Sequence, residues 1–322
     1  MRLAGAACLL VAACALDESG EATPDAETDG PSNDVFVADV VEEADATPAD
    51  VVEEEAAPPA CKPDAPFANA TNLGAINTPA GETSPSLTND ELTIFFQRAP
   101  DTTHSSLFYA QRASKTAPFG PAHPVTTISS AATYDVSPYV VDGMSALYFG
   151  SNRAQGGHVD LFQATGNGQP DGWSNPKPLT TLNETGTDTY DPFIASTGAI
   201  WLSSDRNGND SDLYVTANVS TAPTAYTTLN TAYNELFPVL SSDALTVFFA
   251  RTDSQPRFHV FSATRASTSQ VFTSPQQVSD FDSGNSDNAP GWLSVDGCRM
   301  YLVSDRPGGQ GSFDLWIATR GN

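Results

Sequence analysis

Five acidic residues recur along the sequence, each standing one to three residues before a proline: Glu82, Asp135, Asp191, Glu235 and Asp287. They mark the start of five repeated units, so a fold that arranges the units around an axis gathers these carboxylates near one mouth of a channel. Such a group would attract a cation or a basic segment, and a facing pair is what glycoside hydrolysis requires. The alternative is that each side chain caps its own turn or bonds the backbone of an adjoining unit.

A second set of oxygen-bearing side chains lies between residues 205 and 212. Alternating oxygen ligands suit Ca²⁺, but the stretch lacks the glycine at position six and the glutamate at position twelve of an EF-hand loop. It also coincides with a predicted turn that recurs in other units without such ligands. The sequence therefore predicts no cofactor, with Ca²⁺ kept as the alternative at Asp205, Asn207, Asn209 and Asp212.

Catalytic motifs of known spacing are absent from the sequence. It contains no Gly-x-Ser-x-Gly, phosphate-loop or His-Glu-x-x-His pattern, and its four histidines lack metal-ligand spacing. A net charge of −25 and a pI near 4.1 argue against nucleic acid as a partner, because binding nucleic acid requires neutralised phosphates. The tryptophans are expected in the core rather than on a sugar platform: Trp173, Trp201, Trp292 and Trp316.

The elements that must position these residues are short strands in a repeating order. The prolines that follow the five acids are spaced 53, 54, 46 and 52 residues apart. After each proline come a turn, a strand-like run closed by an arginine, and a third strand such as Asp160–Phe162. A fourth strand is predicted at 124–128, 178–183, 226–230 and 277–281. Four short strands per unit are typical of a β-propeller blade.

The two ends of the repeat region complement each other. The fifth unit stops after its third strand, near Arg320, while residues 67–78 match the fourth strands of the other units in type. The sequence thus predicts an all-β fold: a five-bladed β-propeller over residues 61–322, closed by its N-terminal strand. This closure hides two sheet edges that would otherwise be open.

Two cysteines fall in the same predicted blade. Cys61 precedes the closing strand, and Cys298 lies at the first turn of the fifth unit. We predict a disulfide between them. In the chain-entropy model it would lower the conformational entropy of the unfolded chain and so stabilise the fold by about 5 kcal/mol. Two free thiols are the alternative.

The N-terminal 60 residues have a different character. Residues 1–14 combine Arg2 with an apolar run, as in an export signal. The run ends in Val11-Ala12-Ala13-Cys14, which resembles the lipobox of bacterial lipoproteins, and this resemblance implies lipidation at Cys14. An ordinary signal peptide cut near Ala15 is the alternative. Residues 15–60 hold 15 acids and no Lys or Arg, which predicts a disordered acidic linker.

The repeats also resemble the WD40-like units of TolB-type propellers. The resemblance rests on the Asp-Gly turns at 142–143 and 296–297, on Ser-Asp-Arg and on Asp-Leu-aromatic; units two, three and five match best. It implies a periplasmic or surface-exposed binding role, so we expect a non-catalytic binding module at the cell envelope. The lipobox-like residues, with Ala15 after Cys14, favour anchoring to the outer membrane. We expect a monomer whose ligand is an envelope protein or a glycan. The alternative function is a five-bladed carbohydrate-active enzyme or sugar-binding propeller.

Overall fold

The computed structural model describes residues 61–321 except 69, 131, 155 and 209. The predicted signal peptide (1–14), the lipidated Cys14 and the acidic linker (15–60) lie outside the described residues. In the described part, no helix is long and apolar enough to cross a membrane.

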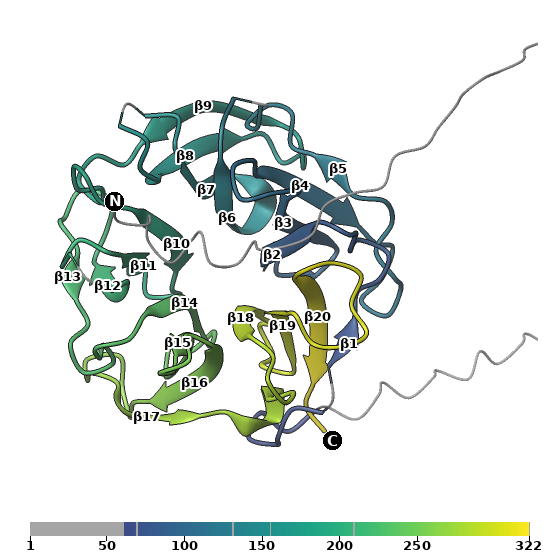
Figure 1. Cartoon of the computed structure of the whole chain (residues 1–322), viewed down its shortest axis with the longest axis vertical. Helices are drawn as coiled ribbons and strands as arrows, with labels where there is room; N and C mark the ends of the chain where they lie inside the picture. The colour runs from purple at the N-terminus through teal and green to yellow at the C-terminus, as the bar shows by residue number, and fades with distance from the viewer. Residues whose placement is uncertain (1–60, 69, 131, 155, 209, 322) are drawn as a thin grey trace, which may run out of the picture. The chain divides into compact units, whose positions relative to one another are not determined.

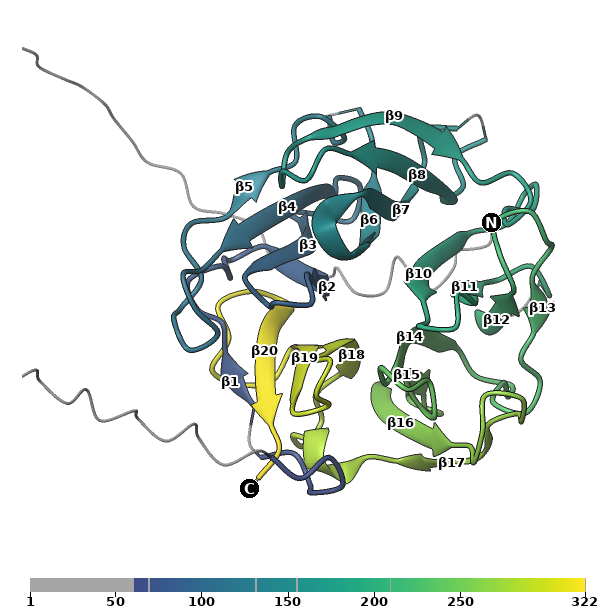
Figure 2. The ribbon, with the colours of Figure 1, turned by 180° about the vertical axis from the view of Figure 1, so that it is seen from behind.

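Five antiparallel sheets of four strands surround a central axis, as predicted (Figures 1 and 2). Blade 1 comprises β2 (Gly81–Leu87), β3 (Thr93–Ala99), β4 (Ser106–Gln111) and β5 (His123–Pro124). Blade 2 comprises β6 (Asp135–Val140), β7 (Ala146–Ser151), β8 (Asp160–Gly166) and β9 (Trp173–Pro178). Blade 3 comprises β10 (Thr189–Ile194), β11 (Ile200–Ser204), β12 (Asp212–Thr216) and β13 (Thr224–Ala225).

Blade 4 comprises β14 (Glu235–Leu240), β15 (Thr246–Thr252), β16 (Phe258–Thr264) and β17 (Thr273–Gln277). Blade 5 comprises β18 (Asn288–Leu293), β19 (Arg299–Ser304), β20 (Asp314–Thr319) and β1 (Thr71–Asn72). Two short 3-10 turns, η2 (Asp142–Met144) and η3 (Ser279–Phe281), complete the elements. The first strand of every blade, such as β2 or β6, lies innermost (Figure 1).

The predicted closure of the ring is confirmed. β1 pairs antiparallel with β20, with Thr71 opposite Ile317, and Phe67 forms a further bridge to Arg320. The predicted disulfide between Cys61 and Cys298 is also present, with Cα atoms 5.9 Å apart. Two segments far apart in the sequence thus complete one sheet and leave the ring without an open seam.

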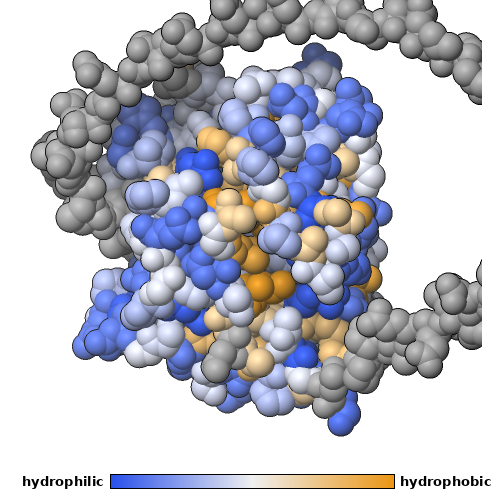
Figure 3. Space-filling model, turned by 90° about the vertical axis from the view of Figure 1, so that its right-hand side faces the viewer, coloured by the Kyte–Doolittle hydropathy of each residue, from blue (hydrophilic) through white to orange (hydrophobic). Residues whose placement is uncertain are grey.

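Both faces of each sheet are covered by neighbouring blades, which explains the continuous apolar runs of the second strands. Phe95 and Phe96 of β3 point to opposite faces of their sheet and are both fully buried. All four tryptophans are buried, as expected for core residues. One core cluster extends from Phe96 of blade 1 to Tyr301 of blade 5. Figure 3 shows the side of the ring where these blades meet, with apolar residues gathered between hydrophilic ones.

The predicted fourth strands are placed slightly too late in each unit. The outer strands end before the apolar stretches that were assigned to them, and those stretches form turns instead. In blade 2, for example, the N–H of Leu182 donates to the carbonyl of Leu179, which lets both leucines of the turn enter the core. Two apolar residues three positions apart, such as Leu179 and Leu182, therefore indicate a buried turn. In a strand, apolar residues on the same face would be two positions apart.

Because successive strands run in opposite directions, the loops divide between two faces of the ring. The loops that lead into the inner strands lie on one face, which we call the entry face. The turns between first and second strands lie on the other, which we call the turn face. Cys298 follows such a turn, so the disulfide fixes Cys61 on the turn face.

Candidate functional site

Each inner strand carries an irregularity beside its proline, and these irregularities shape the channel. The register with the second strand shifts in all five blades, as in a β-bulge. In four blades the residue before the proline has a positive φ of 49–56°: Ser84, Ser137, Asp191 and Phe237. Such a backbone conformation is costly for residues other than glycine, and it turns these side chains toward the channel.

The five predicted site acids do not occupy one equivalent position. Glu82, Asp135 and Glu235 are the first or second residue of their inner strands, two residues before the bulge, and are completely buried. Asp191 lies at the bulge itself, and Asp287 precedes β18 by one residue. Only Asp191 lines the channel cavity.

The three strand-starting acids are each neutralised by the arginine of their own blade. Every pair has a closest N–O distance of 2.7 Å: Glu82 with Arg98, Asp135 with Arg153, and Glu235 with Arg251. In blades 3 and 5 the same strand position holds an uncharged residue, and Thr189 and Asn288 accept hydrogen bonds from Arg206 and Arg306 at 3.3 and 2.6 Å. Burial raises the pKa of Glu82 and Glu235, and the hydrogen bonds from Thr78, Thr231 and the arginines act against that rise.

These arginines also tie the buried turn of the preceding strand to the blade. Each donates from Nη2 to the last carbonyl of that turn, as Arg98 does to Ile76 and Arg251 to Leu229, at 2.8 and 2.5 Å. The guanidinium then stacks on an aromatic ring of the third strand, for example Arg251 on Phe261 at 4.6 Å. We call this repeated unit the arginine clamp. It accounts for the acid, the arginine and the aromatic residue that recur in the sequence.

Asp287 has a different structural contact. Its Oδ1 accepts a hydrogen bond from the backbone N–H of Phe258 at 2.6 Å, and its own N–H donates to Asp305. Asp188 contacts the N–H of Val159 in the same way at the edge of blade 3. Both carboxylates thus join a loop of one blade to the next on the entry face.

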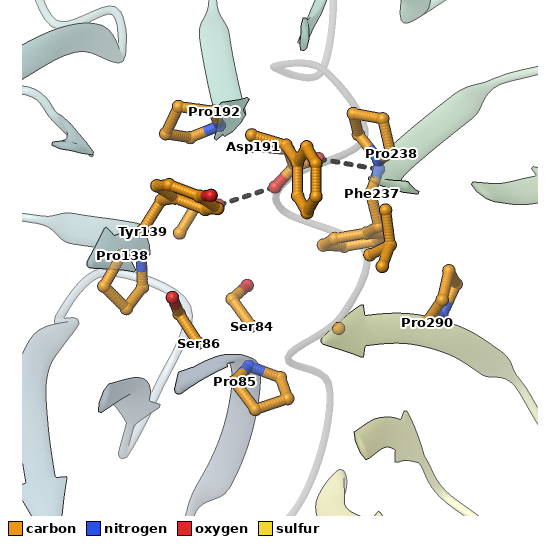
Figure 4. Close-up of a pocket in the computed structure, with 14 residues that line it drawn as sticks. Ser84, Pro85, Ser86, Pro138, Tyr139, Asp191, Pro192, Phe237, Pro238 and Pro290 are labelled. Carbon is orange, nitrogen blue, oxygen red and sulfur yellow. Dashed lines mark hydrogen bonds between the residues drawn. The ribbon is translucent and has the colours of Figure 1, made fainter. Parts of the chain in front are cut away.

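Asp191 is the carboxylate that faces the channel (Figure 4). Its Oδ1 accepts a hydrogen bond from the Ser137 hydroxyl of blade 2 at 2.6 Å, and its Oδ2 accepts one from the N–H of Phe237 of blade 4 at 3.1 Å. No arginine or lysine forms an ion pair with it among the described residues. Burial raises the pKa of Asp191 to about 6, although both hydrogen bonds favour the ionised form.

The channel around Asp191 is narrow. Prolines and serines from the inner strands, together with Tyr139, Phe193 and Phe237, leave a cavity of about 30 Å³ (Figure 4). That space holds a water molecule or a small ion, whereas sites for small organic molecules measure about 300–1,000 Å³. Among the described residues that line it, Asp191 is the only acid, so the channel itself does not supply the two facing carboxylates of a glycosidase.

The residues of the alternative Ca²⁺ site make local contacts. Asp205 accepts the N–H of Asp188 at 2.7 Å, and Asp212 accepts a hydrogen bond from the Asn207 amide. Asn209 lies outside the described residues. Within the described ranges no group of three or more His, Cys, Asp or Glu side chains is arranged to hold a metal. Ca²⁺ at this turn therefore stays an untested alternative to the prediction of no cofactor.

Sequence reasoning missed residues that only contacts between blades reveal. Ser137 gave no signal, although it holds Asp191, and neither did Glu91, a buried acid at the junction of blades 1 and 5. Arg320 was recognised only as the end of the last strand, yet it lines a second cavity. The positive φ of the residue before the proline could not be predicted from the sequence, because serine, aspartate and phenylalanine share no propensity for this conformation.

Comparison with known proteins shows similarity in fold only. No protein-family model matches the sequence, and the comparison with curated proteins found no match. Among solved structures, the α-L-arabinofuranosidase PaAbf62A from Podospora anserina is 13% identical over 81% of this chain and 98% of its own, with a TM-score of 0.52. The catalytic domain of a GH62 α-L-arabinofuranosidase from Coprinopsis cinerea is also 13% identical with the same coverage and a TM-score of 0.50.

TolB from Acinetobacter baumannii is 14% identical over 76% of this chain, with a TM-score of 0.44. This chain spans 56% of the length of that protein. At such identities a structural likeness shows only a shared fold. The five-bladed arrangement predicted from the number of repeats and the closing strand is the one that the structure has.

Proposed function

We propose that this chain is a lipid-anchored protein of the cell envelope whose propeller binds a protein or glycan without transforming it. The lipobox-like residues 11–14 support the anchor, and the acidic stretch 15–60 supports a tether. A disulfide between Cys61 and Cys298 fits an oxidising compartment outside the cytoplasm. Outer-membrane attachment, facing either the periplasm or the medium, is the location that this proposal implies.

The channel geometry is the observation that favours binding over catalysis. In three blades the acid of the inner strand is fixed by an arginine clamp, so its carboxylate is not available to a substrate. One carboxylate, Asp191, remains in a cavity of about 30 Å³. Most glycoside hydrolases need a general acid and a second carboxylate across the scissile bond.

The anchor is tested by expressing the full chain in a bacterium supplied with a clickable fatty acid. We expect label on the wild-type chain and none on Cys14→Ser, while Cys8→Ser keeps the label and serves as the matched control. Label that persists on Cys14→Ser would refute lipidation at this residue. A soluble, unlabelled wild-type chain would instead support the ordinary signal peptide.

A carbohydrate-active enzyme is the second candidate, and one observation favours it. Asp191 has a pKa raised to about 6, in the range of a general acid working near neutral pH. The test is a glycan panel with a reducing-end readout on the full chain. Release of sugar that is lost in Asp191→Asn and kept in the exposed control Asp142→Asn would establish the enzyme. Bound glycan without release supports the binding module.

A further inference from the structure

A second cavity, larger than the channel, lies between blades 4 and 5. It measures about 510 Å³, within the range of sites for small organic molecules. Its wall combines one face of blade 4, a turn of blade 5 and the segment Pro63–Phe67 that follows Cys61. We call it the side pocket. It shares no lining residue with the channel cavity.

The blade 4 wall of the side pocket presents hydroxyl groups around an aromatic ring. Thr246 is paired with Thr264, and Phe248 with Ser262, across β15 and β16, so these four side chains stand on one face of the sheet. None of the three hydroxyls makes a hydrogen bond within the described residues. The wall thus offers groups that can both donate and accept hydrogen bonds.

Arg320 also lines the side pocket and has unused donors. The structure describes ten arginines, and the other nine all donate side-chain hydrogen bonds to protein atoms. The Arg320 side chain donates none, and its Nε is buried without a partner. Its guanidinium lies 4.4 Å from the centre of the Phe67 ring. A guanidinium stacked on an aromatic ring with free N–H groups is held ready for acceptor atoms of a ligand.

The segment Pro63–Phe67 is held in place as a wall. The Cys61–Cys298 disulfide fixes its start, and the N–H of Lys62 donates to the carbonyl of Gly321 at 3.2 Å. At its other end the N–H of Phe67 donates to Asp280 at 2.9 Å. A pocket whose walls are fixed before binding loses little conformational entropy when a ligand enters.

The mixture of groups identifies the ligand class. Hydroxyls and Arg320 supply donors, the carboxylates of Asp64 and Asp280 supply acceptors, and the largely buried rings of Phe67 and Phe248 supply an apolar floor. A polyhydroxylated ring uses all three kinds of group at once. The lining carries three aspartates (Asp64, Asp243 and Asp280) against one arginine, and this negative balance opposes acidic ligands.

We infer that the side pocket binds a sugar of one or two rings that is either neutral or carries an amino group. This inference deepens the proposed function, because it names a glycan as the ligand and places it outside the channel. The Cys61–Cys298 disulfide fixes the start of the segment Pro63–Phe67, and this segment forms one wall of the pocket.

The test uses the full chain in detergent and saturation-transfer NMR with four probes: maltose, cellobiose, diacetylchitobiose and glucosamine. Glucuronic acid is the anionic comparison. We expect saturable binding of at least one of the four. Arg320→Gln, and independently Thr264→Leu, should weaken this binding at least tenfold. Thr165→Leu is the matched control, because Thr165 occupies the equivalent strand position in blade 2 and is exposed.

Binding of none of the four probes, or of glucuronic acid alone, would overturn the inference. So would binding that both pocket variants leave intact while their thermal unfolding matches wild type. Sugar binding that Asp191→Asn abolishes and Thr264→Leu preserves would assign the ligand to the channel. That outcome refutes the side pocket while leaving the proposed function standing.

Discussion

The acidic side chains of the inner strands occupy two different strand positions, which lie two residues apart. Acids at the strand start, such as Glu82 and Glu235, lie in arginine clamps and hold the blade together. The acid at the bulge, Asp191, lies in the channel without a cation beside it. The same residue type is thus a structural ion-pair partner in one position and a titratable channel group in the other.

Asp191 should make the protein less stable as the pH rises. Its pKa is raised by burial from 3.8 to about 6, so the cost of ionising it is absent below pH 4 and complete above pH 6. Two pKa units correspond to about 3 kcal/mol. We expect Asp191→Asn to be more stable than wild type at pH 7.5, by up to that amount, and the difference to shrink toward pH 4.

Urea unfolding of the two proteins at pH 4.5 and pH 7.5 measures this. The Asn side chain can still accept from the N–H of Phe237 and donate to Ser137, so the channel keeps its hydrogen bonds. Asp142→Asn removes the same charge from an exposed turn and should be neutral. If Asp191→Asn lost the same stability at both pH values, the raised pKa of Asp191 would be contradicted.

The inner strands must bend around a narrow axis, and the bulges make this possible. Four blades place the bulge before the proline, whereas blade 5 places it after, at Gly291. There the chain approaches blade 1 so closely that a Cβ would stand 2.3 Å from Cγ of Pro85. Blade 5 therefore needs a glycine where its inner strand meets the first blade.

Gly291→Ala should push the inner strands of blades 1 and 5 apart. Neither the proline ring nor the carbonyl of Tyr301, 3.2 Å from the added Cβ, can yield by a side-chain rotation. Overpacking of this kind costs about 1–3 kcal/mol, which thermal or urea unfolding would measure. Gly321→Ala, where a Cβ meets nothing within 4 Å, is the control. A fully stable Gly291→Ala would show that the strands can shift at little cost.

Several contacts between distant parts of the chain close the ring, among them the pairing of β1 with β20, the disulfide and an ion network. In the network, Glu91 of the first turn in blade 1 binds Arg299 of blade 5 through two hydrogen bonds of 2.7 Å. Tyr301 and Lys115 contact the same carboxylate. Blade 1 and blade 5 are thus joined by charge on the turn face.

Glu91→Gln should weaken this junction in a pH-dependent manner. Burial favours the neutral acid, but Arg299 and Lys115 outweigh it and hold the pKa of Glu91 below its ordinary value. The stabilisation is therefore present at neutral pH and lost as the pH falls through the lowered pKa. We expect a loss of about 3 kcal/mol at pH 7, the lower end for breaking a buried pair.

Unfolding of Glu91→Gln at pH 7 and pH 3.5 checks this, and the gap from wild type should narrow at the lower pH. Asp90→Asn, in the adjoining position of the same turn, is the charge-matched comparison. A gap of equal size at both pH values would mean that the side chain acts through packing rather than charge.

Removing the disulfide with Cys61→Ser and Cys298→Ser together should loosen the whole ring. The bridge joins residues 237 apart, so its loss should cost about 2–5 kcal/mol. Wild type treated with a reductant should show the same decrease in melting temperature, and the double variant should not respond to reductant. If the inferred sugar site is correct, the variant also loses affinity, because residues 63–67 are no longer fixed.

The sequence alone determined the blades and their number. Turn, strand and arginine recur at short range, and the pairing of neighbouring strands follows from such local patterns because each strand binds the next one along the chain. The closing strand and the disulfide were predictable because the last unit lacked one strand and both cysteines fell beside the gap.

Only the tertiary structure decided which side chains face the channel and where a ligand fits. A bulge shifts the register by one residue and so redirects a side chain, and its place beside the proline differs between blades. Asp191 and Asp135 therefore resemble each other in sequence but face different surroundings. The side pocket depends on residues 63–67 packing beside Arg320, and no local pattern encodes a space between two sheets.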